Sequence, residues 1–209
     1  MNNKKTITTI LLFGAIWGII EATFGHLLHF LPTGLSGMIM FPIAFYFMFT
    51  AYKITDKQSA VFGVAIVASL IKLTDLFIPI NSPMSAINPA VSIILESLIV
   101  FAFIKIYSEK RIYLKSTIVS LSWILLFIFS QKIIFQPVEG LYSQPIFMLI
   151  TVIIMNAIVS GAILGTLLKF EQNPNFSHLK YNSNNRSFSM PIGIFIIAIV
   201  FEMGNSFIF

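Results

Sequence analysis

The sequence predicts an all-α protein, a polytopic bundle of transmembrane helices. The chain has 209 residues, of which 57% are hydrophobic and only 10% are charged. A soluble domain of ordinary composition carries about 25% charged residues. The apolar residues are also gathered in long stretches, and a hydrocarbon core needs roughly 20 of them per helix. The chain contains no cysteine, which excludes a disulfide framework, a thiolate metal site and a cysteine nucleophile.

Seven stretches have the length and hydrophobicity of a membrane-spanning helix, six in one body and one appended. Turn-forming residues such as Pro32 and Gly34 separate them. The first begins like a signal peptide, but its apolar run continues to about Leu31 without a small-residue cleavage site, so we expect a retained helix. The predicted spans are residues 7–31, 35–52, 59–80, 86–107, 116–136, 144–169 and 190–209.

The basic residues predict an orientation. Eleven of the thirteen Lys and Arg lie in segments on the side of the N-terminus, and the opposite loops hold none. By the positive-inside rule, the N-terminus is cytoplasmic, and the C-terminus lies outside if all seven spans cross. We therefore expect a multi-pass protein of the inner membrane. The net charge of +5 comes from these basic residues, which orient the helices in the membrane. We therefore expect no nucleic-acid partner.

The chain divides into three predicted parts. Residues 1–170 form a six-helix transmembrane body, and residues 189–209 form the seventh transmembrane helix. Between them, residues 171–188 are rich in Asn and Ser and read as a polar cytoplasmic linker.

Ionisable residues inside the predicted spans are the candidate functional groups. A charge near the bilayer centre costs about 3 kcal/mol or more, so each needs a partner, water or a role. They lie from mid-membrane outward with carboxylates in excess, which favours a pocket that opens to the outside and takes a cationic or polar guest. These residues are Glu21, His26, His29, Lys72, Asp75, Glu96, Lys132 and Glu202.

Three spans place such residues beside small or polar neighbours. Glu21 shares a helical stripe with Gly14 and Gly18, where it either lines a cavity or forms a hydrogen bond between helices. Lys72 and Asp75 have i,i+3 spacing, so they form either part of a pocket or a self-satisfied ion pair.

In the fourth span, Asn88, Ser92 and Glu96 form a ridge with i,i+4 spacing. The preceding Asn81-Ser82-Pro83 segment and the Asn88-Pro89 step suggest an irregular entry from the outer side. Glu202 lies deep in the seventh span and needs a partner, either Lys72 or a residue of the first helix. Next to Gln131, Lys132 is expected to snorkel to the interface.

Metal binding and enzymatic chemistry remain open alternatives. His26 and His29 lie about 60° apart on a helix, and together with Glu21 and Asp75 they are candidate ligands of a divalent metal. The sequence has no H-E-x-x-H or Walker A motif and no G-x-S-x-G elbow. It specifies no cofactor, and an enzyme is the less favoured interpretation. Trp17 and Trp123 lie within spans, where ordinary packing is favoured over an aromatic wall for a ligand.

Two segments resemble a known family. The run Trp17 to His29, followed by Pro32 and Gly34, and the run Asn88 to Ser97 are similar to the substrate-binding S components of energy-coupling-factor transporters. The resemblance covers about residues 10–105. It implies six helices, an outward-facing pocket, and a transmembrane coupling subunit with ATPases as partners. It also implies docking through small residues of the first helix, here Gly14, Gly18 and Ala22; a seventh span and Glu21 on that face depart from the pattern.

The favoured hypothesis is a membrane protein that binds and helps to transport a small polar or cationic solute. Its partners would be the lipid bilayer, the solute and possible coupling subunits. The alternatives are a membrane-embedded enzyme that uses His and Glu, and a structural subunit of a membrane complex. The expected pocket consists of Glu21, His29, Lys72, Asp75 and Glu96, with His26 and Glu202 as second choices.

Overall fold

The computed structural model describes residues 3–25, 28, 35–78, 83–108, 110–135, 141–172 and 188–208. Every regular element in these ranges is a helix, which confirms the all-α prediction for this part of the chain. The elements are α1 (Asn3–Ile20), η1 (Glu21–Gly25), α3 (Leu35–Thr55), α4 (Ser59–Lys72), η2 (Leu73–Phe77), α5 (Pro83–Ile106), α6 (Ile112–Ser130), η3 (Gln131–Phe135), η4 (Leu141–Ser143), α7 (Ile146–Gln172) and α8 (Ser189–Ile208).

Six helical segments are long and apolar enough to cross a membrane, and each matches a predicted span to within a few residues. They indicate a multi-pass integral membrane protein. The seventh predicted span is helix α8, but its described apolar stretch, Ser189–Gly204, is shorter than the other six. That α8 crosses the membrane therefore stays a prediction.

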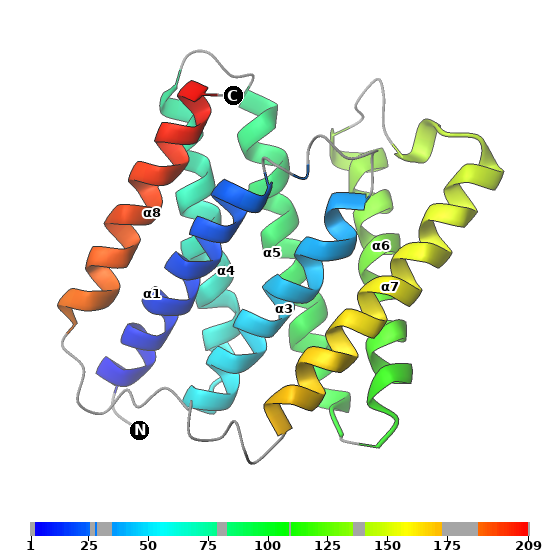
Figure 1. The fold of residues 1–209 in the computed structure, drawn as a ribbon, viewed down its shortest axis with the longest axis horizontal. Coiled ribbons are helices and arrows are strands. Elements are labelled where there is room, and N and C mark those ends of the chain that lie inside the picture. The colour runs from blue at the N-terminus through cyan, green and yellow to red at the C-terminus, as the bar shows by residue number, and fades with distance from the viewer. Residues whose placement is uncertain are drawn as a thin grey trace.

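Successive helices run in alternating directions (Figure 1). The N-terminus, the end of α3 and the start of α4 lie at one end of the bundle, and the C-terminus lies at the other. A hydrogen bond from Lys57 Nζ to Asn3 Oδ1 (3.3 Å) joins α1 to the loop before α4 at this first end. The loops that hold the basic residues thus meet on one side, as the predicted orientation requires, although the cytoplasmic assignment itself stays a prediction.

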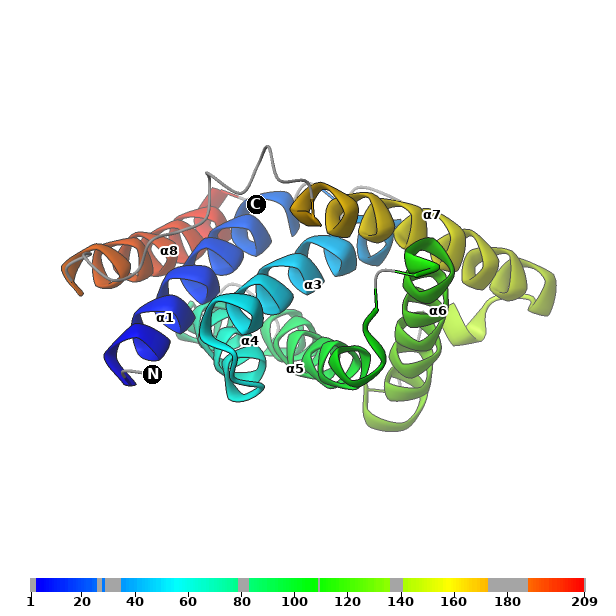
Figure 2. The ribbon, with the colours of Figure 1, turned by 90° about the horizontal axis from the view of Figure 1, so that it is seen from below.

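Helix α3 lies in the centre and packs against α1, α4, α5 and α7. Two peripheral units flank this centre: α8 lies against α1, and α6 pairs with α7 at the opposite end of the molecule (Figure 2). The sequence-distant helix α8 is therefore a neighbour of the first helix rather than an isolated appendage.

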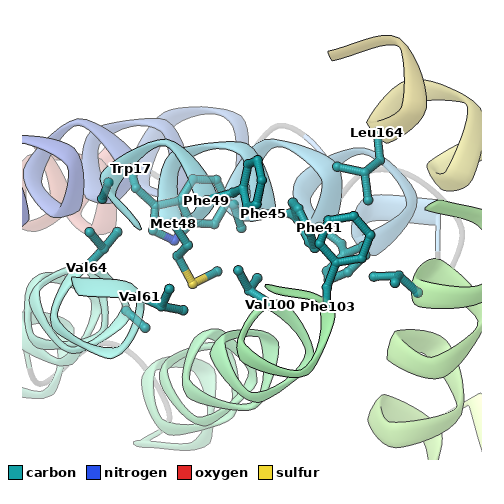
Figure 3. Packing of buried hydrophobic residues seen from close by; sticks show 14 of the residues in the cluster. Trp17, Phe41, Phe45, Met48, Phe49, Val61, Val64, Val100, Phe103 and Leu164 are labelled. Carbon is teal, nitrogen blue, oxygen red and sulfur yellow. The ribbon is translucent and has the colours of Figure 1, made fainter. Parts of the chain in front are cut away.

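The core is aromatic and is built around α3 (Figure 3). Phe45 meets Phe103 edge-on, with ring centroids 5.0 Å apart, and Trp123 stacks on Phe41 at 5.3 Å. Such pairs contribute about 0.5–1.5 kcal/mol each, and in a bilayer this packing replaces the hydrophobic effect as the force between helices. Trp17 and Trp123 are both buried in this core, as ordinary packing requires.

Helix α5 corrects one expectation from the sequence. It runs without interruption from Pro83 to Ile106 with Pro89 inside it, so the irregularity predicted at Asn88-Pro89 is wrong. Asn81 and Ser82, which carry the other part of this prediction, lie outside the described residues. Proline is tolerated inside transmembrane helices because neighbouring groups and small local adjustments satisfy the freed backbone carbonyl. As a result, Asn88, Ser92 and Glu96 stay on one helical face.

Candidate functional site

A buried ion triad joins three elements of the bundle. The Lys72 ammonium, at the end of α4, lies 2.9 Å from Asp75 Oδ2 in η2 and 2.5 Å from Glu202 Oε1 in α8. All three residues are buried, and Glu202 has no exposed surface. The ion pair predicted from the i,i+3 spacing is present, and Lys72 is the partner of Glu202 that the sequence could not choose.

The position of Lys72 follows from close packing of α1 on α4. A Cβ atom on Gly14 would lie 2.5 Å from Val67 Cβ, and one on Gly18 would lie 2.4 Å from Ile71 Cδ1. The two helices run in the same direction, so this register carries Glu21, one turn beyond Gly18, to the level of the triad. The glycines thus bring α1 close enough to α4 for the Glu21 carboxylate to interact electrostatically with the Lys72 ammonium.

The same contacts correct the docking face implied by the resemblance. Gly14 and Gly18 are covered by α4, and Ala22 is fully buried. Small residues allow helices to approach closely whether the partner helix belongs to the same chain or to another. Here the partner is the chain's own α4, so this stripe is not free to receive a coupling subunit.

Glu21 is the first residue of the π-helical turn η1. It is half-buried, and its Oε1 atom lies near Gly25, 3.4 Å from where a Cβ on that glycine would stand. The Lys72 ammonium acts on its carboxylate electrostatically. π-Helical turns are rare and frequently occur at functional sites, since they turn side chains out of the regular helical register.

Glu96 is a buried carboxylate for which no salt bridge is found among the described residues. It is only 5% exposed, and its Oε2 atom has no hydrogen-bond partner. The charged group acting on it is another carboxylate, that of Glu21. Two carboxylates that act on each other away from bulk water repel unless a cation or a proton compensates them.

The ridge of α5 connects Glu96 with a polar contact that sequence reasoning missed. Asn88 and Gln131 exchange two hydrogen bonds: Gln131 Nε2 donates to Asn88 Oδ1 (2.7 Å), and Asn88 Nδ2 donates to Gln131 Oε1 (3.3 Å). Gln131 begins the π-helical turn η3 after α6. Spacing along the chain gave no signal for this pair, because its two residues lie 43 positions apart.

The remaining candidates lie elsewhere. Lys132, in η3, is exposed, as expected for a snorkelling lysine rather than a pocket residue. His26 and His29 lie outside the described residues, so their predicted roles stay predictions. Within the described part of the chain, no group of three or more His, Asp or Glu side chains is arranged to hold a metal ion.

Buried hydroxyl and amide groups between α3 and α7 also contribute to the interior. Ser160 Oγ donates to the Met38 carbonyl (2.8 Å) and lies 3.3 Å from Asn156 Oδ1. Gly161, next to Ser160, abuts Thr117, and Gly165 abuts Tyr113. These contacts form an interhelical packing seam rather than part of the carboxylate site.

Comparisons with known proteins leave the site to be interpreted from its own geometry. No protein-family model matches the chain, and no curated protein and no solved structure matches it.

Proposed function

We propose that this protein binds a small cationic or polar-zwitterionic solute within the membrane and helps to transport it. The observation that carries the proposal is Glu96, a buried carboxylate that lacks a partner for Oε2 and has the Glu21 carboxylate as its charged neighbour. Burying an isolated charge is costly. A cationic guest between the two carboxylates would remove that cost, and this would couple binding to the stability of the fold.

The charge balance of the described interior favours a cation over an anion. Three buried carboxyl groups, those of Asp75, Glu96 and Glu202, and the half-buried one of Glu21 accompany one buried ammonium group, that of Lys72. Lys72 is already held by Asp75 and Glu202. The countercharge for Glu21 and Glu96 must therefore come from a guest or from protons.

The polar ridge of α5 gives the proposed site a direction of access. Asn88, Ser92 and Glu96 lead from the end of α5 opposite the N-terminus toward the middle of the helix. In the predicted orientation that end faces the outside. The Asn88–Gln131 pair then lies between the outer surface and Glu96. A solute that enters from the outside would pass this pair before it reaches Glu96.

The resemblance to S components extends the proposal to partners. A substrate-binding subunit in the inner membrane would deliver its solute through a transmembrane coupling subunit that is driven by ATPases. The docking surface must then be another face than the stripe of Gly14 and Gly18, since α4 covers that stripe.

A structural subunit of a membrane complex is the second candidate function. It is favoured by the triad of Lys72, Asp75 and Glu202, in which one ammonium group pairs with both carboxylates without a guest. The enzyme alternative depends on His26 and His29, which lie outside the described residues.

The proposal is tested by thermal unfolding of the purified protein with a panel of cations: potassium, magnesium, manganese, methylammonium, choline and thiamine. A ligand at about 100 times its Kd should add roughly 2.7 kcal/mol of stability. We expect at least one cation to raise the melting temperature. A panel in which none does so contradicts a cation-binding role and leaves the structural one.

Matched variants locate the site. Glu96→Gln and Glu21→Gln should each abolish the shift, because each removes one of the facing charges while keeping the shape of the side chain. Lys132→Gln alters an exposed residue of a span and should leave the shift intact. A shift that survives both carboxylate substitutions would place the binding site elsewhere.

A further inference from the structure

The proposed solute site, formed by Glu21 and Glu96, is separate from the triad of Lys72, Asp75 and Glu202. The Lys72 ammonium interacts with both groups. Lys72 makes its hydrogen bonds to Asp75 and Glu202, while it also acts on Glu21 from a distance. The contact between Gly18 and Ile71 fixes this arrangement, because it sets Lys72 beside the turn of α1 that leads to Glu21. Any change in how strongly Asp75 and Glu202 hold Lys72 therefore changes the electrostatic interaction between Lys72 and Glu21.

Glu202 comes from a different part of the chain than the other members of the triad. It lies 130 residues after Lys72, on the peripheral helix α8, which packs on α1. Its Oε1 atom accepts a hydrogen bond from the Lys72 ammonium, and its side chain is completely buried. With all groups ionised, Lys72, Asp75 and Glu202 together carry one negative charge. Without the Glu202 charge they carry none, and Asp75 is the one charged acceptor of the triad that remains for the ammonium.

We infer that Glu202 is a specificity-determining residue of the Glu21–Glu96 site: by holding the Lys72 ammonium at the triad, it prevents that ammonium from neutralising Glu21 and so keeps the site selective for cations. This inference rests on the proposed function for its binding assay. It gives α8 a role in solute choice without any contact between α8 and the solute.

The first experiment compares a cation with a neutral molecule of the same shape. Choline and 3,3-dimethyl-1-butanol differ by the charge of one central atom, so their binding to the purified full-length protein separates charge from shape. Glu202→Gln should weaken choline binding on the order of tenfold, as expected for the loss of one nearby charge in a medium of effective dielectric about 20. Binding of the neutral probe should change little.

A second substitution separates charge from structure. In Lys72→Met/Glu202→Gln the triad retains the Asp75 charge alone, which restores its net charge of minus one. Choline binding should then return toward the wild-type value. A purely structural role for Glu202 predicts instead that both probes lose affinity together and that the double variant is worse. Either result would overturn the inference.

Carbodiimide labelling tests the inference without any added ligand. Dicyclohexylcarbodiimide adds across a protonated carboxyl group within membranes to give an N-acylurea, and the modified residue is found by mass spectrometry. In Glu202→Gln the released ammonium should pair with Glu21 and protect it, so its labelling should fall severalfold, whereas the double variant should restore it. Unchanged labelling of Glu21 in Glu202→Gln would overturn the inference.

The outcomes separate the two proposals. If choline and the other cations fail to bind the wild-type protein, the proposed function fails, and the labelling of Glu21 still decides the role of Glu202. If Glu96→Gln abolishes binding but Glu202→Gln leaves the preference for choline unchanged, the proposed function stands and the inference falls. Should Glu202→Gln not accumulate, Asp75→Asn changes the triad by the same charge and should lower choline binding and Glu21 labelling in the same way; no change in either would overturn the inference.

Discussion

Two groups of buried charges lie next to each other in this bundle, and they differ in how they are balanced. In the triad, one ammonium is held by two carboxylates at 2.9 and 2.5 Å. In the neighbouring group, the charged neighbour of Glu96 is a second carboxylate, that of Glu21. An Oε2 atom without a hydrogen bond occurs in both groups, on Glu96 and on Glu202. The difference teaches that buried charge alone does not identify a functional site. A group that closes on itself can hold helices together, whereas a group that lacks its countercharge is suited to bind one.

The sharpest test of the closed group is Lys72→Ala. It leaves the Asp75 and Glu202 carboxylates buried together without their cation, and breaking such an arrangement costs about 3–5 kcal/mol. We expect a large loss of stability in denaturant unfolding or a failure to accumulate in the membrane. A variant as stable as the wild type would show that the triad does not secure α8.

Glu96→Gln tests the group of Glu21 and Glu96, and it should change the stability of the protein in the opposite direction to Lys72→Ala. Without ligand, replacing this buried carboxylate by a neutral amide removes a buried charge and its repulsion from Glu21, which should stabilise the protein by roughly 1 kcal/mol or more. The measurement is thermal unfolding in the absence of added cations. A destabilised variant would mean that Glu96 already has a partner that compensates it, and the contrast between the two groups would disappear.

Gly18→Ala tests the packing that places the two groups side by side. The added Cβ would lie 2.4 Å from Ile71 Cδ1 and 3.2 Å from Ile71 Cβ and Cγ2. The Ile71 side chain must therefore shift or α1 and α4 must move apart slightly, and overpacking of this kind costs about 1–3 kcal/mol. The matched control is Gly193→Ala in α8, where no atom lies within 4 Å. Equal unfolding midpoints for the two variants would argue against the seam between α1 and α4.

Lys132→Ala should have the smallest effect. This lysine is the other cation inside a predicted span, but it is exposed, and exposed substitutions usually change stability by less than about 0.5 kcal/mol. Unfolding of Lys72→Ala and Lys132→Ala measured side by side would show the difference between a buried and a snorkelling lysine. A loss for Lys132→Ala comparable to that for Lys72→Ala would contradict the assignment.

The sequence predicted well what depends on local pattern. Length and hydrophobicity located the helices to within a few residues, because a membrane leaves few alternatives to a helix. The pairing of Lys72 with Asp75 followed from their spacing, since it is set by a single helical turn. The placement of both tryptophans in the core was also correct.

Contacts between distant helices could not be predicted in the same way. Glu202 reaches Lys72 and Gln131 reaches Asn88 only because of how whole helices pack. The glycine stripe of α1 shows the limit most clearly. Its pattern correctly indicated a close helix–helix contact, but a stripe of small residues does not state whether its partner is another protein or, as found here, helix α4.

The span of 130 residues between Lys72 and Glu202 also bears on how the protein is made. At about 5–20 residues per second of synthesis, Lys72 enters the membrane roughly 7–26 s before Glu202 emerges. Asp75 follows Lys72 by only three residues, so it can neutralise the ammonium during this interval. The local pair would therefore neutralise the ammonium until Glu202 of α8 joins it.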